Sequence, residues 1–393
     1  MNVSTGVGER NARLLDRVGA PLKLFFFAVL PVIVTGQVLV AAIRLDAFAV
    51  DFHHSFRPAA AAVLDGRSPY LDAGSELASG AAFVYPPVAA VVLTPFALVP
   101  AAAGDALFTA LLVASALLAL WALGVRDPRC YGVTFLWAPV FSAVQTANVT
   151  LLLVLGLAVV WRHRDRFAVA ATVTAVVVAS KLFLWPLVVW LALTRRYRAA
   201  AAAVALGAAL TFGAWAAIGF AGLREYPATM RVFTRLMREE AYTPFAVALQ
   251  LGIPEGGAHA LGLVIGGAVL AGSAWFARHG RADKALVLAI AAAILFSPLV
   301  WLHYFALLLV PLAILRPTFG PLWLFPLGLW ICPARLDGPN LLAAIPLAVG
   351  GLMLFLALRD SGERLLPDEP GGGRRWRRPL PIARRTEANT APA

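Results

Sequence analysis

The sequence is poor in charged residues, which make up only 14% of its 393 residues. A soluble domain carries about 25% charged residues, whereas hydrophobic residues reach 61% here and the mean hydropathy is +0.79. This shortage of charge excludes an ordinary soluble protein and indicates an integral membrane protein. The chain also lacks short segments of alternating polarity, which are typical of an outer-membrane barrel. Long Ala, Leu and Val blocks predict an all-α polytopic membrane protein instead.

Cysteine is nearly absent. The two cysteines, Cys130 and Cys332, lie far apart and form no metal-binding or redox spacing, so no disulfide can be predicted from them. We therefore expect no metal and no cofactor. An internal repeat is not visible either.

The net charge of +12 comes largely from arginines in short loops and near the C-terminus. Because no basic soluble domain accompanies them, a nucleic-acid partner is not expected. Lys and Arg collect on the cytoplasmic side of membrane proteins, so residues 1–23 are expected to be a cytoplasmic N-terminus without a cleavable signal. Residues 359–393 are expected to be a disordered, basic cytoplasmic tail. The heavy use of Ala and Arg indicates a bacterial plasma membrane protein.

Residues 24–358 are expected to form a transmembrane domain of about ten to twelve spans. A strict alternation of these spans across the membrane places Arg126 and Arg129 on the external side, which conflicts with the cytoplasmic location expected for arginine. The apolar runs cover residues 24–43, 84–99, 106–125, 133–144, 149–161, 169–180, 182–193, 199–220, 258–277, 285–296, 305–315, 319–331 and 341–358.

Lys181 lies in the middle of an apolar run between two basic loops, residues 162–166 and 195–198. Both loops can be cytoplasmic only if the run enters the membrane and returns to the same side. Each half of the run is then only about 18 Å long, at 1.5 Å per residue. That is shorter than the hydrocarbon core of about 30 Å. The sequence therefore predicts a broken hairpin with Lys181 at the floor of a water-filled cavity.

The stretch 44–83 is polar, long for a connection between spans, and predicted to be an external loop forming one wall of an active site. Asp51 follows the first span and lies between Phe48 and Phe52, where desolvation would favour a general base. A solvated loop acid is the alternative. His54, Arg57 and Arg67 can bind a phosphate or simply face water.

Two residues place a charge or a titratable ring inside apolar runs. Lys181 and His303 would be costly there without a function. A snorkelling lysine at a span end and a neutral, hydrogen-bonded core histidine are the alternatives.

Six short motifs follow one another along the chain. The motifs are Asp51-Phe52, LDGRSPY at 64–70, FVYPP at 83–87 with Pro95 and Pro100, QTAN at 145–148, Lys181 with Pro186, and SPLVWLHY at 297–304. Over about residues 24–320 the chain resembles glycosyltransferase family 87, the bacterial GT-C-fold enzymes that use polyprenyl-phosphate-mannose. One departure is Val144, where the family pattern has a glycine before the glutamine.

The resemblance implies a GT-C-type helical bundle and an inverting, metal-independent transfer of a hexose, namely mannose, on the external side. The partners would be a polyprenyl-phosphate sugar donor, a lipid-linked glycan acceptor of the cell envelope and membrane lipid. Asp51 would be the catalytic base. The donor phosphate or sugar would contact Lys181, His303, Arg57, Arg67 and His54. The cavity would be lined by Tyr85, Gln145, Asn148, Trp301 and Tyr304.

Two other classes of protein remain open on the sequence. A lipid or glycolipid flippase also uses charges at mid-membrane depth and broken helices, although it needs no long polar first loop. A structural subunit of an envelope complex is the other alternative. Asp51→Asn discriminates among them, since only the enzyme needs the carboxylate for chemistry.

Overall fold

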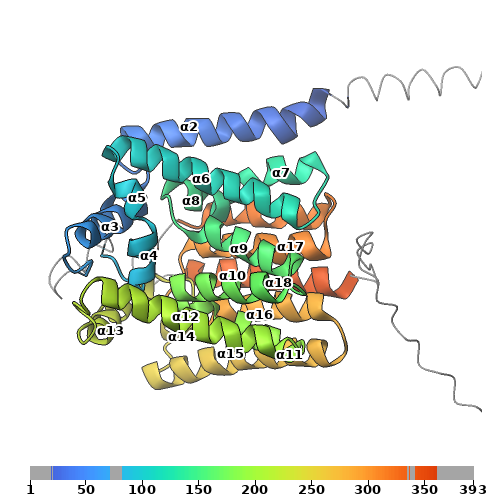
Figure 1. Cartoon of the computed structure of the whole chain (residues 1–393). Coiled ribbons are helices and arrows are strands. Elements are labelled where there is room, and N and C mark those ends of the chain that lie inside the picture. The colour runs from blue at the N-terminus through green and yellow to red at the C-terminus, as the bar shows by residue number, and fades with distance from the viewer. Residues whose placement is uncertain (1–18, 20, 71–81, 334–335, 337–340, 361–393) are drawn as a thin grey trace, which may run out of the picture. The chain divides into compact units, whose positions relative to one another are not determined.

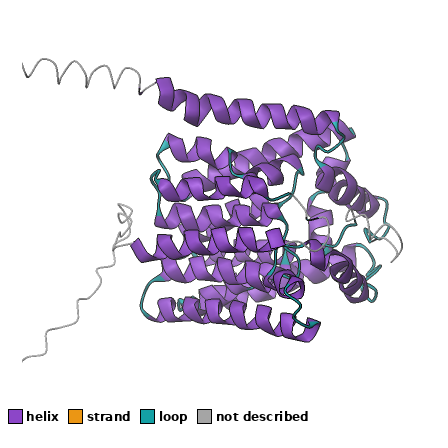
Figure 2. Cartoon of the chain, turned by 180° about the vertical axis from the view of Figure 1, so that it is seen from behind, coloured by secondary structure: helices purple, strands orange, loops and turns teal. Residues whose placement is uncertain are grey.

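The computed structural model describes residues 19, 21–70, 82–333, 336 and 341–360, and these residues form helices and loops without a strand (Figure 1, Figure 2). The first half contains η1 (Phe25–Val29), α2 (Leu30–Arg44), η2 (Phe52–Phe56), α3 (Arg57–Leu64), α4 (Pro87–Val92), α5 (Thr94–Ala97), α6 (Ala101–Ala122), α7 (Pro128–Phe135), α8 (Ala138–Gln145), α9 (Thr150–Arg162), α10 (Phe167–Ser180), η4 (Leu182–Leu184) and α11 (Pro186–Leu193). The second half contains α12 (Tyr197–Ala217), α13 (Tyr226–Met237), η5 (Arg238–Glu240), α14 (Pro244–Gln250), α15 (Glu255–Arg278), α16 (Ala282–Phe296), η6 (Leu302–Leu308), α17 (Leu309–Leu315), η7 (Pro321–Ile331), η8 (Leu341–Ala343) and α18 (Ala344–Asp360).

Several helices are long and apolar enough to cross a membrane, which confirms an all-α polytopic membrane protein. Five helices of the described part pass this test by length and composition, and α8 and α9 pass it only together, with a bend of 119° at the break between them. Four shorter apolar helices accompany them. The expected number of about ten to twelve spans stays a prediction. The long helices are Pro21–Arg44, Ala101–Ala122, Tyr197–Ala217, Glu255–Arg278 and Leu341–Arg359.

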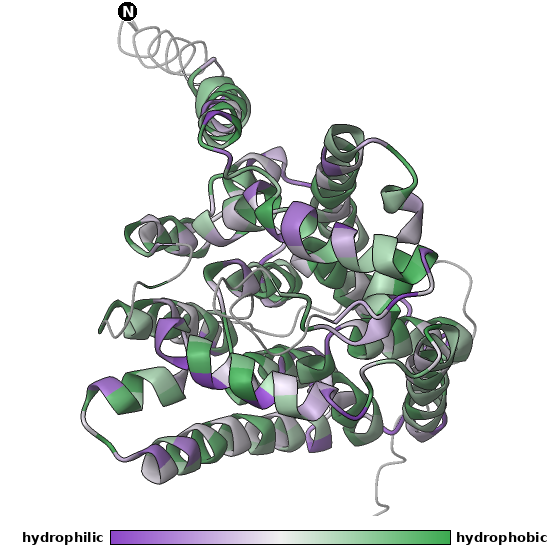
Figure 3. Cartoon of the chain, turned by 90° about the vertical axis from the view of Figure 1, so that its left-hand side faces the viewer, coloured by the Kyte–Doolittle hydropathy of each residue, from purple (hydrophilic) through white to green (hydrophobic). Residues whose placement is uncertain are grey.

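The expected span over residues 84–99 is not a span. Proline stands near the start of both α4 and α5, which are only six and four residues long. Because proline lacks an N–H and restricts the residue before it, this apolar run folds into two short helices instead of one continuous helix. They lie with α3 and α13 at one end of the helical bundle (Figure 1). Figure 3 views this end, where hydrophilic residues occur on short helices among mostly hydrophobic ones.

Basic loops meet at the opposite end of the bundle. Arg196 pairs with Asp165 at 2.6 Å, and the Arg162 guanidinium donates to the carbonyl of Ala122. Asp127 accepts from the backbone N–H of Phe319 at 3.1 Å. The loops after α6, α9, α11 and α17 therefore share one end, away from α3, α4 and α13 (Figure 1).

One large hydrophobic core joins most of the helices between these ends. The Trp137 indole donates to the carbonyl of Trp323 at 2.9 Å, which ties α8 to η7. Gly132 on α7 lies so close to η1 that a Cβ there would stand 1.8 Å from the carbonyl oxygen of Phe27. Only glycine permits that approach. Residues 359 and 360 of the expected tail belong to α18, and the rest of that tail, residues 361–393, lies outside the described residues.

Candidate active site

Asp51 is held by backbone contacts with a segment almost a hundred residues away. After α2 ends, Asp46 and Ala49 take positive φ angles of 51° and 55°, which turn the chain sharply. The N–H of Ala49 then donates to Gln145 at 2.7 Å, and that of Asp51 donates to Thr146 at 2.9 Å. The start of the polar loop is thereby fixed to the turn between α8 and α9.

Asn148 connects this turn to the carboxylate. Its Nδ2 donates to Asp51 Oδ2 at 2.7 Å, and its Oδ1 accepts from the N–H and the hydroxyl of Thr150. The two contacts from Thr150 fix the orientation of the amide, since only the oxygen can accept them. The NH₂ group must therefore face Asp51.

The environment of Asp51 favours a carboxylate that can take up a proton. The side chain is half-buried, and burial raises its pKa above the ordinary value of 3.8. The hydrogen bond from Asn148 and the charge of Lys181 act in the opposite direction. A carboxylate with a raised pKa is a better general base than a fully solvated one.

Lys181 lies at a break between two helices. α10 ends at Ser180, and Lys181 takes extended dihedral angles of −144° and 100° before η4 and α11 continue. The expected break of the hairpin at Lys181 is confirmed. The side chain is buried, its Nζ lies 3.5 Å from Asn148 Oδ1, and it stands over the ring of Tyr304 at 3.8 Å.

Aromatic rings complete the surroundings of the lysine. The Lys181 ammonium also lies 5.1 Å from the ring of Tyr85 and 5.9 Å from that of Phe183. Cation–π contacts of this kind stabilise a desolvated ammonium. No ion pair within 4.0 Å joins Lys181 to Asp51 in the described part of the chain. The two opposite charges are close, yet a ligand can approach each of them.

The backbone around Tyr85 is held by an aromatic cluster. The Tyr70 hydroxyl donates to the carbonyl of Tyr85 at 3.0 Å, and the Tyr226 hydroxyl donates to that of Val84 at 3.1 Å. Tyr70 also stacks on Trp215 with ring centroids 5.3 Å apart. These contacts tie α12 and α13 to the segment before α4.

A cavity of about 210 Å³ brings these residues together. Six of the expected site residues line it: Asp51, Tyr85, Asn148, Lys181, Trp301 and Tyr304. Ser55 and Tyr226 line it as well and were missed from the sequence. Ser55 follows Asp51 by four residues, a helical spacing that could have indicated it, and its buried hydroxyl has no partner among the described residues. Tyr226 carried no signal in the sequence.

Five expected residues do not line this cavity. Gln145 donates to the carbonyl of Ala47, and Arg57 donates to that of Val99. Arg67 pairs with Asp65 in an exposed position, and His54 is exposed beside His53. His303 is buried behind Tyr304, with ring centroids 4.9 Å apart and no partner for its Nε2 among the described residues. A role in donor binding stays a prediction for Arg57, Arg67, His54 and His303.

An apolar groove lies next to this cavity. It has a volume of about 380 Å³ and lies between α12 and the segment from α10 to α11. Leu182, next to Lys181, lines both the groove and the cavity. The groove is lined by Val178, Ala179, Leu182, Trp185, Val188, Val189, Ala203, Val204, Gly207, Ala208, Thr211 and Phe212. The groove, whose lining has no charged residue, thus lies directly beside the buried Lys181.

Metal-binding geometry is not found in the part of the chain that the structure describes, where His, Cys, Asp and Glu form no group of three. His53 and Asp105 form a separate pair, with Nδ1 2.7 Å from Oδ2.

Comparison with known proteins identifies one similarity. The family model of glycosyltransferase family 87 matches residues 83–302, more than half of the chain. The matched region contains Tyr85, Asn148 and Lys181 and begins after Asp51. No curated protein and no solved structure matches the chain.

Proposed function

Because the chain belongs to glycosyltransferase family 87, we propose that it transfers a hexose, mannose, from a polyprenyl-phosphate donor to a lipid-linked or envelope glycan acceptor. The observation that carries this proposal is the cavity in which Asn148 contacts both Asp51 and Lys181. An acid able to act as a base and a buried cation are the two groups that such a transfer needs.

Asp51 is the general base in this proposal. The oxygen of an acceptor hydroxyl attacks the anomeric carbon, its proton passes to the Asp51 carboxylate, and the bond from the anomeric carbon to the phosphate oxygen breaks. The raised pKa of Asp51 supports this role. Inversion follows from a single displacement. It is supported by the cavity lining, which contains Asp51 as its one carboxylate within the described ranges, so a second carboxylate for a covalent intermediate is lacking there.

Lys181 stabilises the leaving group. As the sugar departs, a second negative charge develops on the prenyl monophosphate, and a fixed cation in a water-poor cavity stabilises it strongly. Tyr85, Phe183 and Tyr304 surround the ammonium and hold it in place without neutralising it. Ser55, with its unpartnered hydroxyl, is positioned to contact the sugar.

The apolar groove accommodates the prenyl chain. It starts at Leu182 beside Lys181, so a phosphate at the ammonium would leave its hydrocarbon chain at the mouth of the groove. Its lining carries no charged residue, which suits a hydrocarbon chain. A donor with a lipid monophosphate therefore matches both the cation and the groove.

Transfer takes place on the external side of a plasma membrane. The basic loops meet at the end of the bundle opposite to α3, α4 and α13, and basic loops are retained in the cytoplasm. The end that holds the polar loop and the cavity then faces outside (Figure 1).

The test is donor turnover in nanodiscs that contain polyprenyl-phosphate-mannose and a membrane lipid extract. We expect wild-type protein to move the sugar into a glycolipid, and Asp51→Asn to lose about 10²–10⁴-fold of the rate, as when a general base is removed. Asp46→Asn is the matched control, because Asp46 lies outside the cavity.

The outcomes separate the alternatives. Equal rates of transfer for wild type and Asp51→Asn would support the enzyme class and show that Asp51 is not the general base. If wild-type protein shows no transfer but moves a fluorescent glycolipid across proteoliposomes, the flippase interpretation replaces this one.

A further inference from the structure

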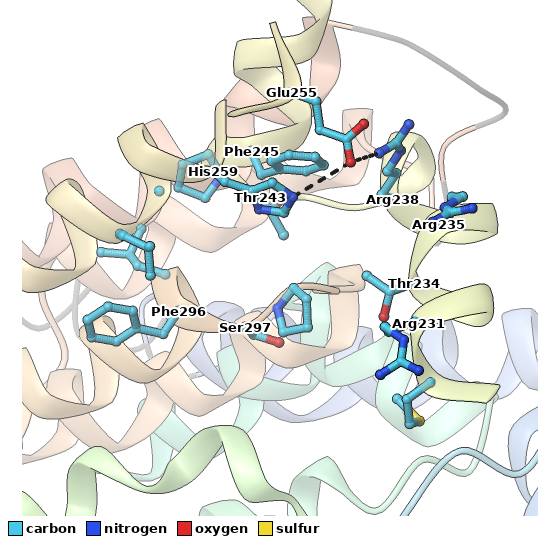
Figure 4. A pocket seen from close by; sticks show the side chains of 16 residues that line it. Arg231, Thr234, Arg235, Arg238, Thr243, Phe245, Glu255, His259, Phe296 and Ser297 are labelled. Carbon is cyan, nitrogen blue, oxygen red and sulfur yellow. Dashed lines mark ion pairs between the residues drawn. The ribbon is translucent and has the colours of Figure 1, made fainter. Parts of the chain in front are cut away.

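A second and larger cavity adjoins the first. It has a volume of about 490 Å³ and lies among α13, the start of α14, the first half of α15 and the end of α16 (Figure 4). Met230, Ser297 and Pro298 line both cavities. The second cavity is therefore a direct neighbour of the cavity that contains Asp51.

One wall of this cavity is strongly basic. Arg231, Arg235 and Arg238 follow one another at intervals of four and three residues, which places them on one face of α13 and η5. Arg238 pairs with Glu255 at 2.6 Å. Neither Arg231 nor Arg235 has an ion pair or a side-chain hydrogen bond with another described residue. The wall thus carries two uncompensated positive charges.

The side of the cavity opposite the arginines carries large apolar side chains together with Glu255 and His259. Phe245 and Phe296 lie across the cavity from α13 (Figure 4). Leu263 of α15 lines the cavity as well. Leu263 and its neighbour Val264 are also 65% and 67% exposed on α15, a candidate span. The cavity therefore offers cations on one side and, on the other, a surface that continues onto the lipid-facing side of α15.

The two neighbours of the active-site cavity differ in chemistry. At Leu182 the active-site cavity adjoins a groove without charged residues, which suits the prenyl chain of the donor. At Met230, Ser297 and Pro298 it adjoins the arginine-lined cavity. Guanidinium groups bind phosphate through paired hydrogen bonds. Since Lys181 already serves the donor phosphate, the arginines are available to a second anionic group.

We propose that the cavity lined by Arg231, Arg235 and Arg238 binds the phosphate-bearing headgroup of the lipid that accepts the sugar. This inference rests on the proposed function. The phosphate contacts Arg231 and Arg235, the hydrocarbon chains lie against Phe245 and Phe296, and the acceptor hydroxyl reaches Asp51 past Met230. The site thereby selects an acceptor that is both anionic and amphiphilic.

The first arm of the test measures binding without turnover. Dioctanoyl-phosphatidic acid and dioctanoylglycerol, which lacks the phosphate, are titrated by calorimetry into Asp51→Asn protein in a neutral detergent. We expect binding of the phosphatidic acid only. Arg231→Gln/Arg235→Gln, added to Asp51→Asn, should weaken it at least about tenfold, since each charged hydrogen bond contributes that much. Arg224→Gln, an exposed arginine outside both cavities, is the matched control.

The second arm measures turnover with the same arginine variants in the active protein. The lipid extract and polyprenyl-phosphate-mannose are varied in turn. We expect Arg231→Gln/Arg235→Gln to raise the amount of extract needed for half-maximal transfer about tenfold or more and to leave the dependence on the donor unchanged. Size-exclusion profiles and melting temperatures equal to those of the wild type show that the variant is folded.

Each result decides the question. Equal binding of both lipids, or equal affinity in the arginine variant, overturns the phosphate site. If the arginine variant loses binding but needs the same amount of extract for half-maximal transfer, the site binds a bulk phospholipid and the acceptor role is overturned. A change in the dependence on the donor alone also overturns the acceptor role. If wild-type protein shows no transfer, the proposed function and the acceptor role both fail, while the binding arm still decides whether the phosphate site exists.

Discussion

At the scale of single residues, the proposed chemistry depends on Asp51 and Lys181, two opposite charges held near each other without a direct ion pair. Asn148 contacts both, with Nδ2 on the carboxylate and Oδ1 facing the ammonium. A direct ion pair would stabilise both charges and lower the basicity of Asp51. A neutral amide between them keeps the acid basic and the lysine available to an anion.

The proposed role of Asp51 as the base predicts how the rate of transfer depends on pH. The base must be ionised, so kcat/KM falls as the pH falls through the pKa of Asp51. Burial raises that pKa, so the acidic limb lies above the ordinary value of 3.8. The hydrogen bond from Asn148 lowers the pKa, and its removal in Asn148→Ala should move the limb to higher pH and reduce the rate. The measurement is a pH profile of transfer in nanodiscs.

Thr194→Ala, at the end of α11 and outside both cavities and the groove, is the control for that profile. A limb at the same pH in Asn148→Ala would show that another group limits the acidic side and would remove Asp51 as its origin.

At the scale of helices, the groove beside α12 makes donor length testable. Ala208 is exposed and lines the groove. Its replacement by Phe should displace part of the prenyl chain and raise KM for a long-chain donor roughly tenfold, since each buried methylene contributes about 0.8 kcal/mol. A mannosyl phosphate with only two isoprene units should be affected much less, because its shorter chain occupies less of the groove.

Ala205→Phe provides the matched control, because Ala205 is an exposed alanine of the same helix that does not line the groove. An equal effect of both substitutions, or an equal effect on short and long donors, would contradict the assignment of the groove.

The start of α7 is a second prediction at this scale. Asp127 accepts from the N–H of Arg129 as the N-cap of the helix, pairs with the Arg129 guanidinium at 2.8 Å and accepts from Phe319. These contacts lower its pKa to about 2. Asp127→Ala should cost roughly 0.5–2 kcal/mol, the usual range for a lost cap, and lower the melting temperature in detergent.

The lowered pKa of Asp127 also predicts how the stabilisation by Asp127 changes with pH. A pKa lowered in the folded state stabilises the protein above pH 3.8 and ceases to do so as the pH falls toward 2. The difference in melting temperature between wild type and Asp127→Ala should therefore shrink in acid. Arg129→Gln separates the ion pair from the cap, and a variant Asp127→Ala as stable as the wild type would refute the role of the cap.

At the scale of the whole helical unit, the gathering of arginines at one end predicts its orientation. A cysteine at Asp65, on the side of the cavity, should react with a membrane-impermeant maleimide on intact cells. A cysteine at Asp165 should react only after permeabilisation. Both side chains are well exposed, at 59% and 74%. Cys130 and Cys332 are buried and give little background. The reverse pattern would place the active site in the cytoplasm.

The structure also explains why the count of spans from the sequence conflicted with Arg126 and Arg129. The apolar run 84–99 was counted as a span, but α4 and α5 remain at the end that holds the cavity (Figure 1). Removing that span from the count places Arg126 and Arg129 with the other basic loops. Charge bias and helix length together therefore describe the chain better than hydropathy alone.

The sequence by itself determined the class of protein and its family. A shortage of charge and long apolar runs report directly on the solvent that surrounds the helices. The break at Lys181 was predictable too, because two basic loops lie too close together for two full spans. The order of the motifs was sufficient to indicate the family, which the match over residues 83–302 then confirmed.

Only the tertiary structure decided which polar residues meet. Asp51 and Asn148 lie 97 positions apart and are joined because the turn after α8 pairs with the backbone before η2. Gln145 and Arg57 carry suitable side chains but donate to carbonyl groups of the protein outside the cavity. Spacing along a chain reports on one helix at a time, whereas a cavity forms where several helices pack, and their packing depends on contacts that no local pattern contains.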